Sequence, residues 1–269
     1  MTGGMKILTV FLAALAASFP ALPLLAEVQP PPGLDVYVLG EVHDNPAHHA
    51  EQARLVALIA PKVVVWEMLS PEQVAAMDGV DRADRAAMEA ALGWAQSGWP
   101  DFAMYHPIFV AAGEARHVGA ALPRARVRRA IEESAAAVLG AEAKGWPLGP
   151  LPPEEQEARE QEQQIAHCNA LPVAMLGGMV EAQRMRDWSL ASAAVAAVAA
   201  GQGPVVVITG SGHARRDWGA PALIAAAHPE VTVWSLGQGE GPAAAGAPYD
   251  AMLTAPAPER DDPCLAFAG

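Results

Sequence analysis

The sequence predicts an α/β domain with a mostly parallel central sheet, flanked by helices, and a helical insertion that forms a lid over the carboxyl edge of the sheet. Short β-branched runs alternate along the chain with longer runs rich in Ala and Leu, which is the pattern of parallel strands joined by covering helices. Between about 124 and 200 this alternation stops and only helical segments occur. Such a stretch is expected over the strand ends, where α/β proteins bind their ligands.

Residues 1–26 have the pattern of a signal peptide, with Lys6 before an apolar run at 7–19 and prolines after it. The run is too short to span a bilayer comfortably, and no cysteine follows it that could carry a lipid. A retained membrane anchor is the alternative. We therefore expect a periplasmic or secreted protein without a stable membrane anchor. Residues 27–34 then form a proline-rich tether, and 35–269 form the α/β domain.

Charge and cysteine content narrow the functional classes. The formal net charge of −13 argues against a nucleic-acid partner, because binding to phosphates needs an excess of Lys and Arg. The two cysteines, Cys168 and Cys264, can form one disulfide in an oxidising compartment and so hold the C-terminal tail. Two buried free thiols are the alternative.

The expected strands are short apolar runs with helices between them. They lie at 35–39, 63–66, 118–121, 205–209 and 231–236, with a sixth at 249–253. The first, second and fourth are continuous apolar runs, which is typical of strands covered on both faces, so we expect them at the centre of the sheet. Within the insertion, the turn-rich segment GWPLGPLPP at 145–153 separates a first helical stretch from two others.

The loop after the first strand carries a dense group of polar side chains. Gly40 is expected to end the strand, because a residue without Cβ lets the backbone turn sharply. Asn45 is a good helix N-cap and Pro46 a good first helical residue, so these two have a structural explanation. Glu41 and His43 have no such explanation, and we expect them to carry chemistry.

Two further strands deliver polar side chains to the same edge. Glu67 follows the run VVVW, and a carboxylate there is costly unless a cation, a metal or hydrogen-bond donors meet it. His213 follows VVVITGSG. Because the carboxyl ends of parallel strands meet at one edge, these residues are expected to converge with those of the first loop. The candidates for metal ligands, acid/base groups or hydrogen-bond donors are then Glu41, His43, Glu67 and His213.

Seven segments together resemble the ChaN-like haem-binding family. They are GEVHDNPAHH, WEM, GWPDFAMYHPIF, LPR at 122–124, HCNALP, GMVEAQRMRDWSLA and GSGHARRDWGAP, in this order. That family is similar to the Tiki and TraB proteins and the erythromycin esterases, whose members use a GxxH or GExxH loop, a later Glu and a later His. The resemblance maps these positions to Gly40, Glu41, His43, Glu67 and His213.

The resemblance implies an α/β core with helical insertions and haem binding for iron uptake at the bacterial envelope. It also implies haems paired between two subunits, hence a homodimer, and a tyrosine as the iron ligand. Tyr105 is the tyrosine that we expect in this role, although an aromatic side chain at a helix start also serves packing. Alternative iron ligands are His48, His49, His106 and His167.

Other side chains are expected near the haem. Arg184 and Arg186 can pair with its propionates or with Glu41, and Met175, Met179 and Met185 can line an apolar face. Surface salt bridges and core packing are the alternatives for these residues. No CxxCH motif occurs, so any haem is expected to be bound non-covalently.

Two functions from different classes follow. The first is an exported protein that binds haem in the cleft between sheet and lid and serves haem or iron uptake or handling. Its expected haem-binding residues are Tyr105, Glu41, His43, His213 and Arg184. The second is a hydrolase of the esterase or protease type, in which Glu41 and His43 activate water, alone or on a divalent metal held with Glu67 and His213. Whether the chain is an enzyme stays open.

Overall fold

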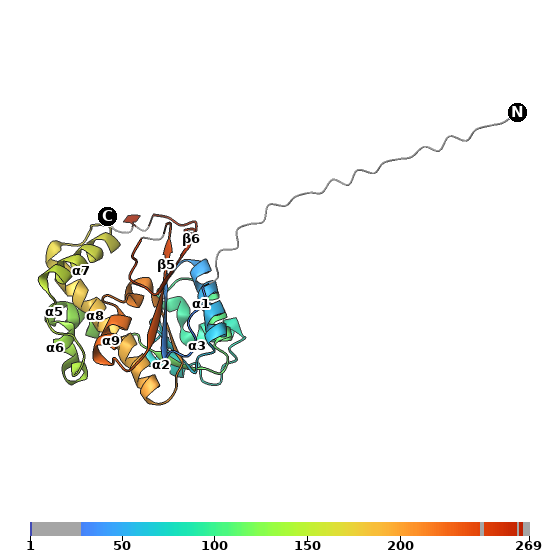
Figure 1. Ribbon diagram of the computed structural model, residues 1–269, viewed down its shortest axis with the longest axis horizontal. Coiled ribbons are helices and arrows are strands. Elements are labelled where there is room, and N and C mark those ends of the chain that lie inside the picture. The colour runs from blue at the N-terminus through green and yellow to red at the C-terminus, as the bar shows by residue number, and fades with distance from the viewer. Residues whose placement is uncertain (2–27, 243–244, 263, 266–269) are drawn as a thin grey trace.

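The central sheet is parallel throughout and is seen nearly edge-on in Figure 1, a computed structural model that describes Met1 and residues 28–242, 245–262 and 264–265. Six strands of the described chain form it, in the order β3-β2-β4-β1-β5-β6. Helices lie on both sides of the sheet in the picture. The predicted α/β class is therefore confirmed.

All six predicted strands occur, with ends that differ by up to four residues from the expected ones. They are β1 (Val36–Glu41), β2 (Val63–Trp66), β3 (Arg116–Gly119), β4 (Val205–Gly210), β5 (Val233–Glu240) and β6 (Ala251–Ala255). The three continuous apolar runs became β1, β2 and β4, which lie inside the sheet as predicted. β3 begins earlier than expected, at the exposed Arg116, because an edge strand tolerates a polar side chain.

β1 continues two residues further than expected, so that Gly40 and Glu41 lie within it and pair with Thr209 and Gly210 of β4. Gly40 therefore does not end the strand, and the prediction of a turn there was wrong. A Cβ atom at this position would lie 2.8 Å from the Leu236 carbonyl oxygen, closer than packed atoms come. Glycine is needed because neighbouring backbone approaches the strand, which then carries Glu41 directly into the site.

Gly40→Ala is expected to lower the free energy of unfolding by about 1–3 kcal/mol, the range for overpacking of a well-packed interior. The added Cβ would meet backbone atoms of Leu236 and Ser211 at 2.8 Å, and backbone cannot move aside as a flexible side chain does. Urea denaturation measures the difference. Gly212→Ala is the matched control, because nothing lies within 4 Å of a Cβ at Gly212. Equal stability of the two variants would contradict the packing explanation.

One face of the sheet is covered by α1 (Pro46–Ile59), α3 (Arg85–Leu92) and α4 (Phe102–Ala111), and the short α2 (Pro71–Ala75) follows β2. As predicted, Asn45 caps α1, whose first residue is proline, by accepting a hydrogen bond from the Ala47 N–H. The strand side chains that pack on this layer are Tyr37, Leu39, Val64, Trp66, Val206 and Ile208. Every second residue of these strands therefore faces α1 and α4.

The opposite face carries the insertion and α9 (Ala220–Ala227). The insertion folds as α5 (Arg124–Glu133), α6 (Ala135–Leu139), α7 (Pro153–Ala166) and α8 (Val173–Ala199). α5, α6, α8 and α9 lie on one side of the sheet in Figure 1, and α1 and α3 on the other. Short 3-10 helices in the part of the chain that the structure describes lie at Trp94–Gln96, Gly140–Ala143 and Ser211–Ala214.

The insertion is only partly the lid that the sequence predicts. Leu190, Ala191 and Ala194 of α8 are buried in one core with the valines of β1, β2 and β4, so this half of α8 covers the face of the sheet. α5 and α7 pack on α8 instead. Within the insertion, α5 and α7 therefore do not pack on the face of the sheet as this half of α8 does, and they correspond to the predicted lid over the strand ends.

The ends of the domain are held by local contacts. Val28, in the expected tether, accepts a hydrogen bond from Arg54 and packs on the core of α1, so the part of the tether that the structure describes is ordered against the domain. The predicted signal peptide lies almost wholly outside the described residues. No helix among the described residues is long and apolar enough to cross a membrane.

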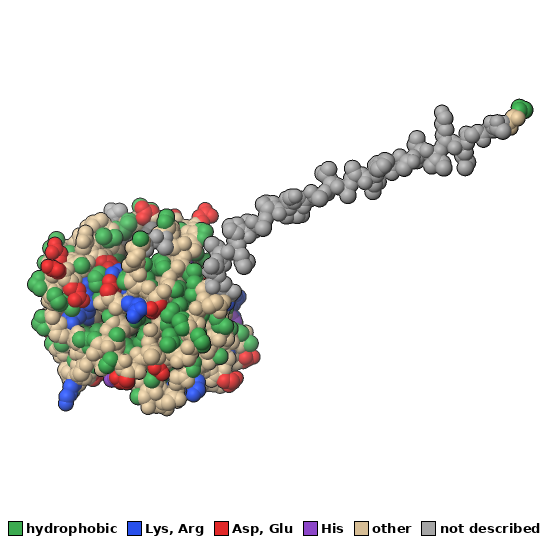
Figure 2. Space-filling model, in the orientation of Figure 1, with side chains coloured by type: hydrophobic (Ala, Val, Ile, Leu, Met, Phe, Trp, Pro, Cys, Tyr) green, Lys and Arg blue, Asp and Glu red, His purple; other side chains and the backbone are tan. Residues whose placement is uncertain are grey.

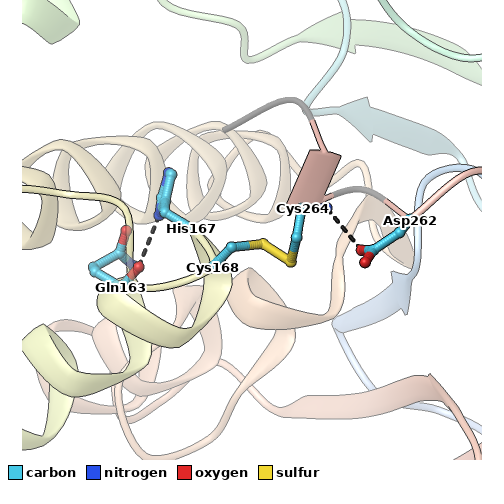
Figure 3. Close-up of a disulfide and its surroundings, with 5 residues drawn as sticks. All are labelled: Gln163, His167, Cys168, Asp262 and Cys264. Carbon is cyan, nitrogen blue, oxygen red and sulfur yellow. Dashed lines mark hydrogen bonds between the residues drawn. A yellow bond between two sulfur atoms is a disulfide. The ribbon is translucent and has the colours of Figure 1, made fainter. Parts of the chain in front are cut away.

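A disulfide joins Cys168, at the end of α7, to Cys264 in the C-terminal tail (Figure 3). The predicted disulfide is confirmed, and the alternative of two free thiols was wrong. Close to the bond, His167 Nδ1 lies 2.8 Å from the Gln163 carbonyl oxygen, and the Cys264 N–H donates to Asp262. The tail is thereby fixed to the corner between α7 and α8.

Candidate functional site

The end of β1 presents a histidine backed by a buried carboxylate. Glu41 is 2% exposed, and its Oε1 atom accepts a hydrogen bond from His43 Nδ1 at 2.8 Å and another from the Tyr105 hydroxyl at 3.1 Å. His49 Nδ1 lies 3.2 Å from the other carboxylate oxygen of Glu41, and His49 Nε2 donates to the His43 carbonyl oxygen. The His43 side chain, in contrast, is 35% exposed and meets the edge of Trp99 at a centroid distance of 4.9 Å.

This first network fixes the protonation of His43. Burial raises the pKa of Glu41, but hydrogen bonds from His43 and His49 outweigh burial and lower that pKa below its usual value. Burial likewise lowers the pKa of His43, whereas the hydrogen bond to Glu41 and the charge of Glu67 raise it overall. Glu41 is therefore an ionised acceptor, so His43 donates from Nδ1 and presents Nε2 outward from the pair.

A second network surrounds the ends of β2 and β4. Glu67 Oε2 accepts hydrogen bonds from the Thr209 hydroxyl at 2.6 Å and from the Gly210 N–H at 2.8 Å. Its other oxygen lies 3.5 Å from His213 Nε2, while His213 Nδ1 lies 2.6 Å from Asp187 of α8. His213 is thus held between two carboxylates.

The charge state of the second network follows from that geometry. Burial lowers the pKa of His213, but the charges of Glu67 and Asp187 raise it to about 9. Burial raises the pKa of Glu67, yet the charges of His213 and His43 together with the Thr209 and Gly210 donors lower it to about 2. Burial raises the pKa of Asp187 although His213 opposes that shift. An imidazolium between carboxylates is the arrangement that these contacts favour.

A cleft of about 1040 Å³ opens between the strand ends and the helices α5, α7 and α8. Its size is at the upper end of the range of about 300–1,000 Å³ for ligand pockets. The two networks meet at its floor, where His43, Glu67 and His213 line it. Its walls are Met68, Gln73, Gln96, Ser97, Gly98, Trp99, Ala120, Ala121, Leu122, Arg124, Val127, Arg128, Ile131, Gln163, Ala166, His167, Met179, Gln183, Arg186 and Leu190.

Residues 32–224 match the profile of the family described as haem-binding uptake, Tiki superfamily, ChaN. The chain belongs to this family. Among solved structures, its fold is similar to that in "Cofacial heme binding to ChaN of Campylobacter jejuni", with a TM-score of 0.63 and 19% identity over 80% of this chain and 86% of that chain. At this identity the likeness shows the fold alone.

Two other solved structures are more distant. The type III effector HopBA1 has a TM-score of 0.43 and 12% identity, over 82% of this chain and 87% of that chain. A succinoglycan biosynthesis protein has a TM-score of 0.39 and 12% identity, over 77% and 66%. Among curated protein sequences, none matches this chain.

In this ChaN-family chain, three of the four strand-end residues predicted from sequence line the cleft, and Glu41 lies directly behind one of them. The predicted convergence is thus observed, but the four residues do not surround one point. Within the described residues, no group of three or more His, Cys, Asp or Glu side chains could hold a metal ion. Each carboxylate is engaged by its own donors instead. The divalent metal and the hydrolase built on it gain no support from this geometry.

Two predicted haem-binding residues lie away from the cleft wall. Arg184 is buried against Pro147 and Gly149, whose carbonyl oxygens it contacts, and it pairs with Glu181. The prediction that Arg184 faces the cleft was therefore wrong. Positions two residues apart on a helix point to nearly opposite sides, and the rotation of α8 is set by its packing on the sheet. Tyr105 is fully buried beneath Glu41, and the packing of α4 on α1 keeps its hydroxyl from the cleft.

The alternative ligands named from sequence have mostly structural contacts. His48 Nδ1 accepts from the Val42 N–H, and its Nε2 donates to the Gly239 carbonyl oxygen. His106 Nε2 lies 2.9 Å from the Arg82 carbonyl oxygen. Both rings therefore bind backbone. Of the remaining predicted residues, His167, Met179 and Arg186 line the cleft, Met185 is in the core, and Met175 is 42% exposed.

Sequence reasoning missed Asp187 and Thr209. Asp187 stands on the buried stripe of α8 with Val180, Arg184 and Ala191, at the three- and four-residue spacing of one helix face. A carboxylate on an otherwise buried helix stripe was the signal that could have found it. Thr209 gave no such signal, because a threonine in a β-branched run is ordinary strand composition.

Proposed function

We propose that this ChaN-family protein binds haem non-covalently in the cleft, with the His43 imidazole as the iron ligand. The observation that carries the proposal is the state of His43. Its Nδ1 donates to the buried Glu41, and no hydrogen bond to its Nε2 is formed within the described residues. A carboxylate behind a histidine fixes the tautomer with a free Nε2 lone pair and makes that nitrogen more basic.

The cleft suits such a ligand in composition as well as size. Apolar side chains such as Trp99, Leu122 and Met179 share its walls with cationic ones, as an amphipathic macrocycle with carboxylate substituents requires. Bound haem would supply an iron that accepts a nitrogen ligand, and His43 would provide that ligand. The other cleft imidazoles are less available, because both nitrogens of His213 face carboxylates and His167 Nδ1 lies 2.8 Å from the Gln163 carbonyl oxygen.

Tyr105 has a different role in this proposal from the one predicted from sequence. Burial and the adjacent Glu41 carboxylate raise the pKa of Tyr105 strongly, which opposes the phenolate that ferric iron binds. Its hydroxyl donates to Glu41 and to the His43 carbonyl oxygen. We therefore assign Tyr105 to positioning Glu41, and through it His43.

The physiological role that we propose is haem handling by an exported protein, with haems paired between two copies of the chain. The N-terminal pattern of residues 1–26 supports export, and so does the disulfide between Cys168 and Cys264. Pairing is supported by exposed apolar side chains on two helices that line the cleft, since Ile165 of α7 is 64% exposed and Val173 of α8 is 77% exposed. ChaN of Campylobacter jejuni, whose fold is similar, binds heme cofacially.

Titration of the purified protein with hemin tests the proposal. We expect a Soret shift that saturates at about one haem per chain, because each chain offers one open imidazole nitrogen. Sedimentation of the same samples is expected to show a dimer that forms only with hemin. Absence of a saturable Soret shift would contradict haem binding, and a monomer at saturation would contradict the pairing alone. Dialysis against EDTA is expected to leave the apoprotein's thermal stability unchanged.

A further inference from the structure

We propose that Arg124, Arg128 and Arg186 form a carboxylate-binding wall of the cleft, which selects tetrapyrroles with free acid side chains. This inference rests on the proposed function, since it deepens the account of the same cleft. Arg124 and Arg128 lie one turn apart on α5, and Arg186 lies on α8. All three line the cleft that His43 enters.

The positions of these arginines are set by the packing of two helices. α5 lies directly against α8, where a Cβ atom at Gly178 would stand 2.5 Å from the Ile131 carbonyl oxygen. Arg186 is further held by a hydrogen bond to Gln183, one turn away, at 3.0 Å. Its charge reaches the cleft floor, where it opposes protonation of His213. The wall therefore belongs to the same cavity as the two networks.

Their charge is uncompensated in a protein that is otherwise acidic. The chain has 30 Asp and Glu against 17 Lys and Arg, and acidic side chains are spread over the face shown in Figure 2. Arg126 and Arg129, on the same helix α5, each pair with an acid, Glu142 and Glu133.

Arg124, Arg128 and Arg186 differ from these neighbours. Within the described residues none of the three makes an ion pair, and Arg186 contacts only the neutral Gln183. Three guanidinium groups without acids at one cleft favour an anionic ligand. The planar guanidinium matches a carboxylate with two parallel hydrogen bonds.

The two propionates of haem are carboxylates of this kind. Arg124, Arg128 and Arg186 would hold these carboxylates, and apolar side chains of the same cleft would contact the macrocycle. Together, the charge-assisted hydrogen bonds made there are expected to contribute about 10- to 100-fold in affinity, because the arginines also face solvent. A tetrapyrrole whose propionates are esterified keeps the iron and the apolar surface but loses these bonds.

The test compares hemin with hemin dimethyl ester, in the same dilute detergent, by Soret titration. The wild type is expected to bind hemin about 10- to 100-fold more tightly than the ester. The double variant Arg124→Ala/Arg128→Ala is expected to lose that preference by weakening hemin alone. Arg129→Ala is the matched control, because Arg129 lies on the same helix but pairs with Glu133 at the surface.

Iron-free protoporphyrin IX, followed by fluorescence, gives a readout that does not involve the iron ligand. Its affinity is expected to fall in the double variant and in Arg186→Gln, and to fall with added salt in the wild type. Equal affinity of the wild type for hemin and its ester would contradict the carboxylate-binding wall, but it would leave the proposal of haem binding intact. An equal loss of affinity for hemin and for hemin dimethyl ester in the double variant would also contradict the proposed wall. Failure of the wild type to bind any of the three ligands would instead overturn the proposed function.

Discussion

Replacing His213 with alanine is expected to lower the free energy of unfolding by about 3–5 kcal/mol, the range for removing one partner of a buried ion pair. His213 is 6% exposed, and its two ring nitrogens face Asp187 at 2.6 Å and Glu67 at 3.5 Å. Without the imidazolium, two carboxylates remain inside the protein without a cation. Urea denaturation of the apoprotein measures the loss without any contribution from a ligand.

The loss should depend on pH in a defined direction. The pKa of His213 is about 9 in the folded protein, above its ordinary 6.5, so its contribution is complete below pH 6.5 and is lost as the pH rises through about 9. The pKa of Glu67 is about 2, below its ordinary 4.5, so its contribution is present above pH 4.5 and is lost as the pH falls through about 2. Asp187 acts in the opposite sense, because burial raises its pKa and ionising it costs stability.

The difference in stability between wild type and His213→Ala is therefore expected to be largest between pH 4.5 and 6.5 and to shrink above pH 9. His228→Ala is the control, since His228 meets the edge of Trp146 and pairs with the exposed Glu230 at the surface, where a pair contributes about 0–1 kcal/mol. A loss as small as that of the control, or one that does not change with pH, would show that His213 is not a buried cation.

Replacing His43 with alanine is expected to weaken hemin binding by about 10- to 100-fold or more, because even the partners of metal ligands contribute that much. The visible spectrum of the bound ferric haem should change as well, since the proposed nitrogen ligand is gone. Glu41→Gln keeps the ligand but replaces its ionised acceptor, so an intermediate loss of affinity is expected. Resonance Raman and electron paramagnetic resonance spectra report the ligand directly.

Two comparisons make this prediction specific. His106→Ala is the control, because His106 bonds to the Arg82 carbonyl oxygen and should leave hemin binding unchanged. Tyr105→Phe separates the two iron ligands under consideration. If His43 is the ligand, removing the Tyr105 hydroxyl costs Glu41 one hydrogen bond and shifts affinity slightly, with the spectrum retained. Loss of a phenolate signature in Tyr105→Phe, together with an unchanged His43→Ala, would assign the iron to Tyr105.

The sheet could be predicted from sequence because local composition decides it. The runs at 63–66 and 205–209 are apolar without alternation, which only a strand covered on both faces tolerates, and they became the central β2 and β4. Parallel strands then bring their carboxyl ends to one edge. Position in the chain was therefore enough to place Glu67 and His213 at the site.

The direction of helical side chains was harder to predict from sequence. That direction depends on the rotational orientation in which the helix packs against its neighbours. Arg184 and Arg186 are two residues apart, yet the first binds backbone carbonyls behind α8 and the second lines the cleft. Tyr105 was expected to bind iron because of its surroundings in the chain. The packing of α4 against α1 instead places its hydroxyl on Glu41.

Sequence alone determined the parallel sheet, the residues at its carboxyl edge, the start of α1 and, from the count of two cysteines, the disulfide. Each depends on neighbours in the chain or on a rule that holds for all parallel sheets. Only the tertiary structure decided that Glu41 and His43 form one network, and Glu67, His213 and Asp187 another. Distances of a few ångströms between side chains of different elements decide that His43 is an open imidazole and His213 a buried imidazolium. Such distances are set only when the helices pack on the sheet.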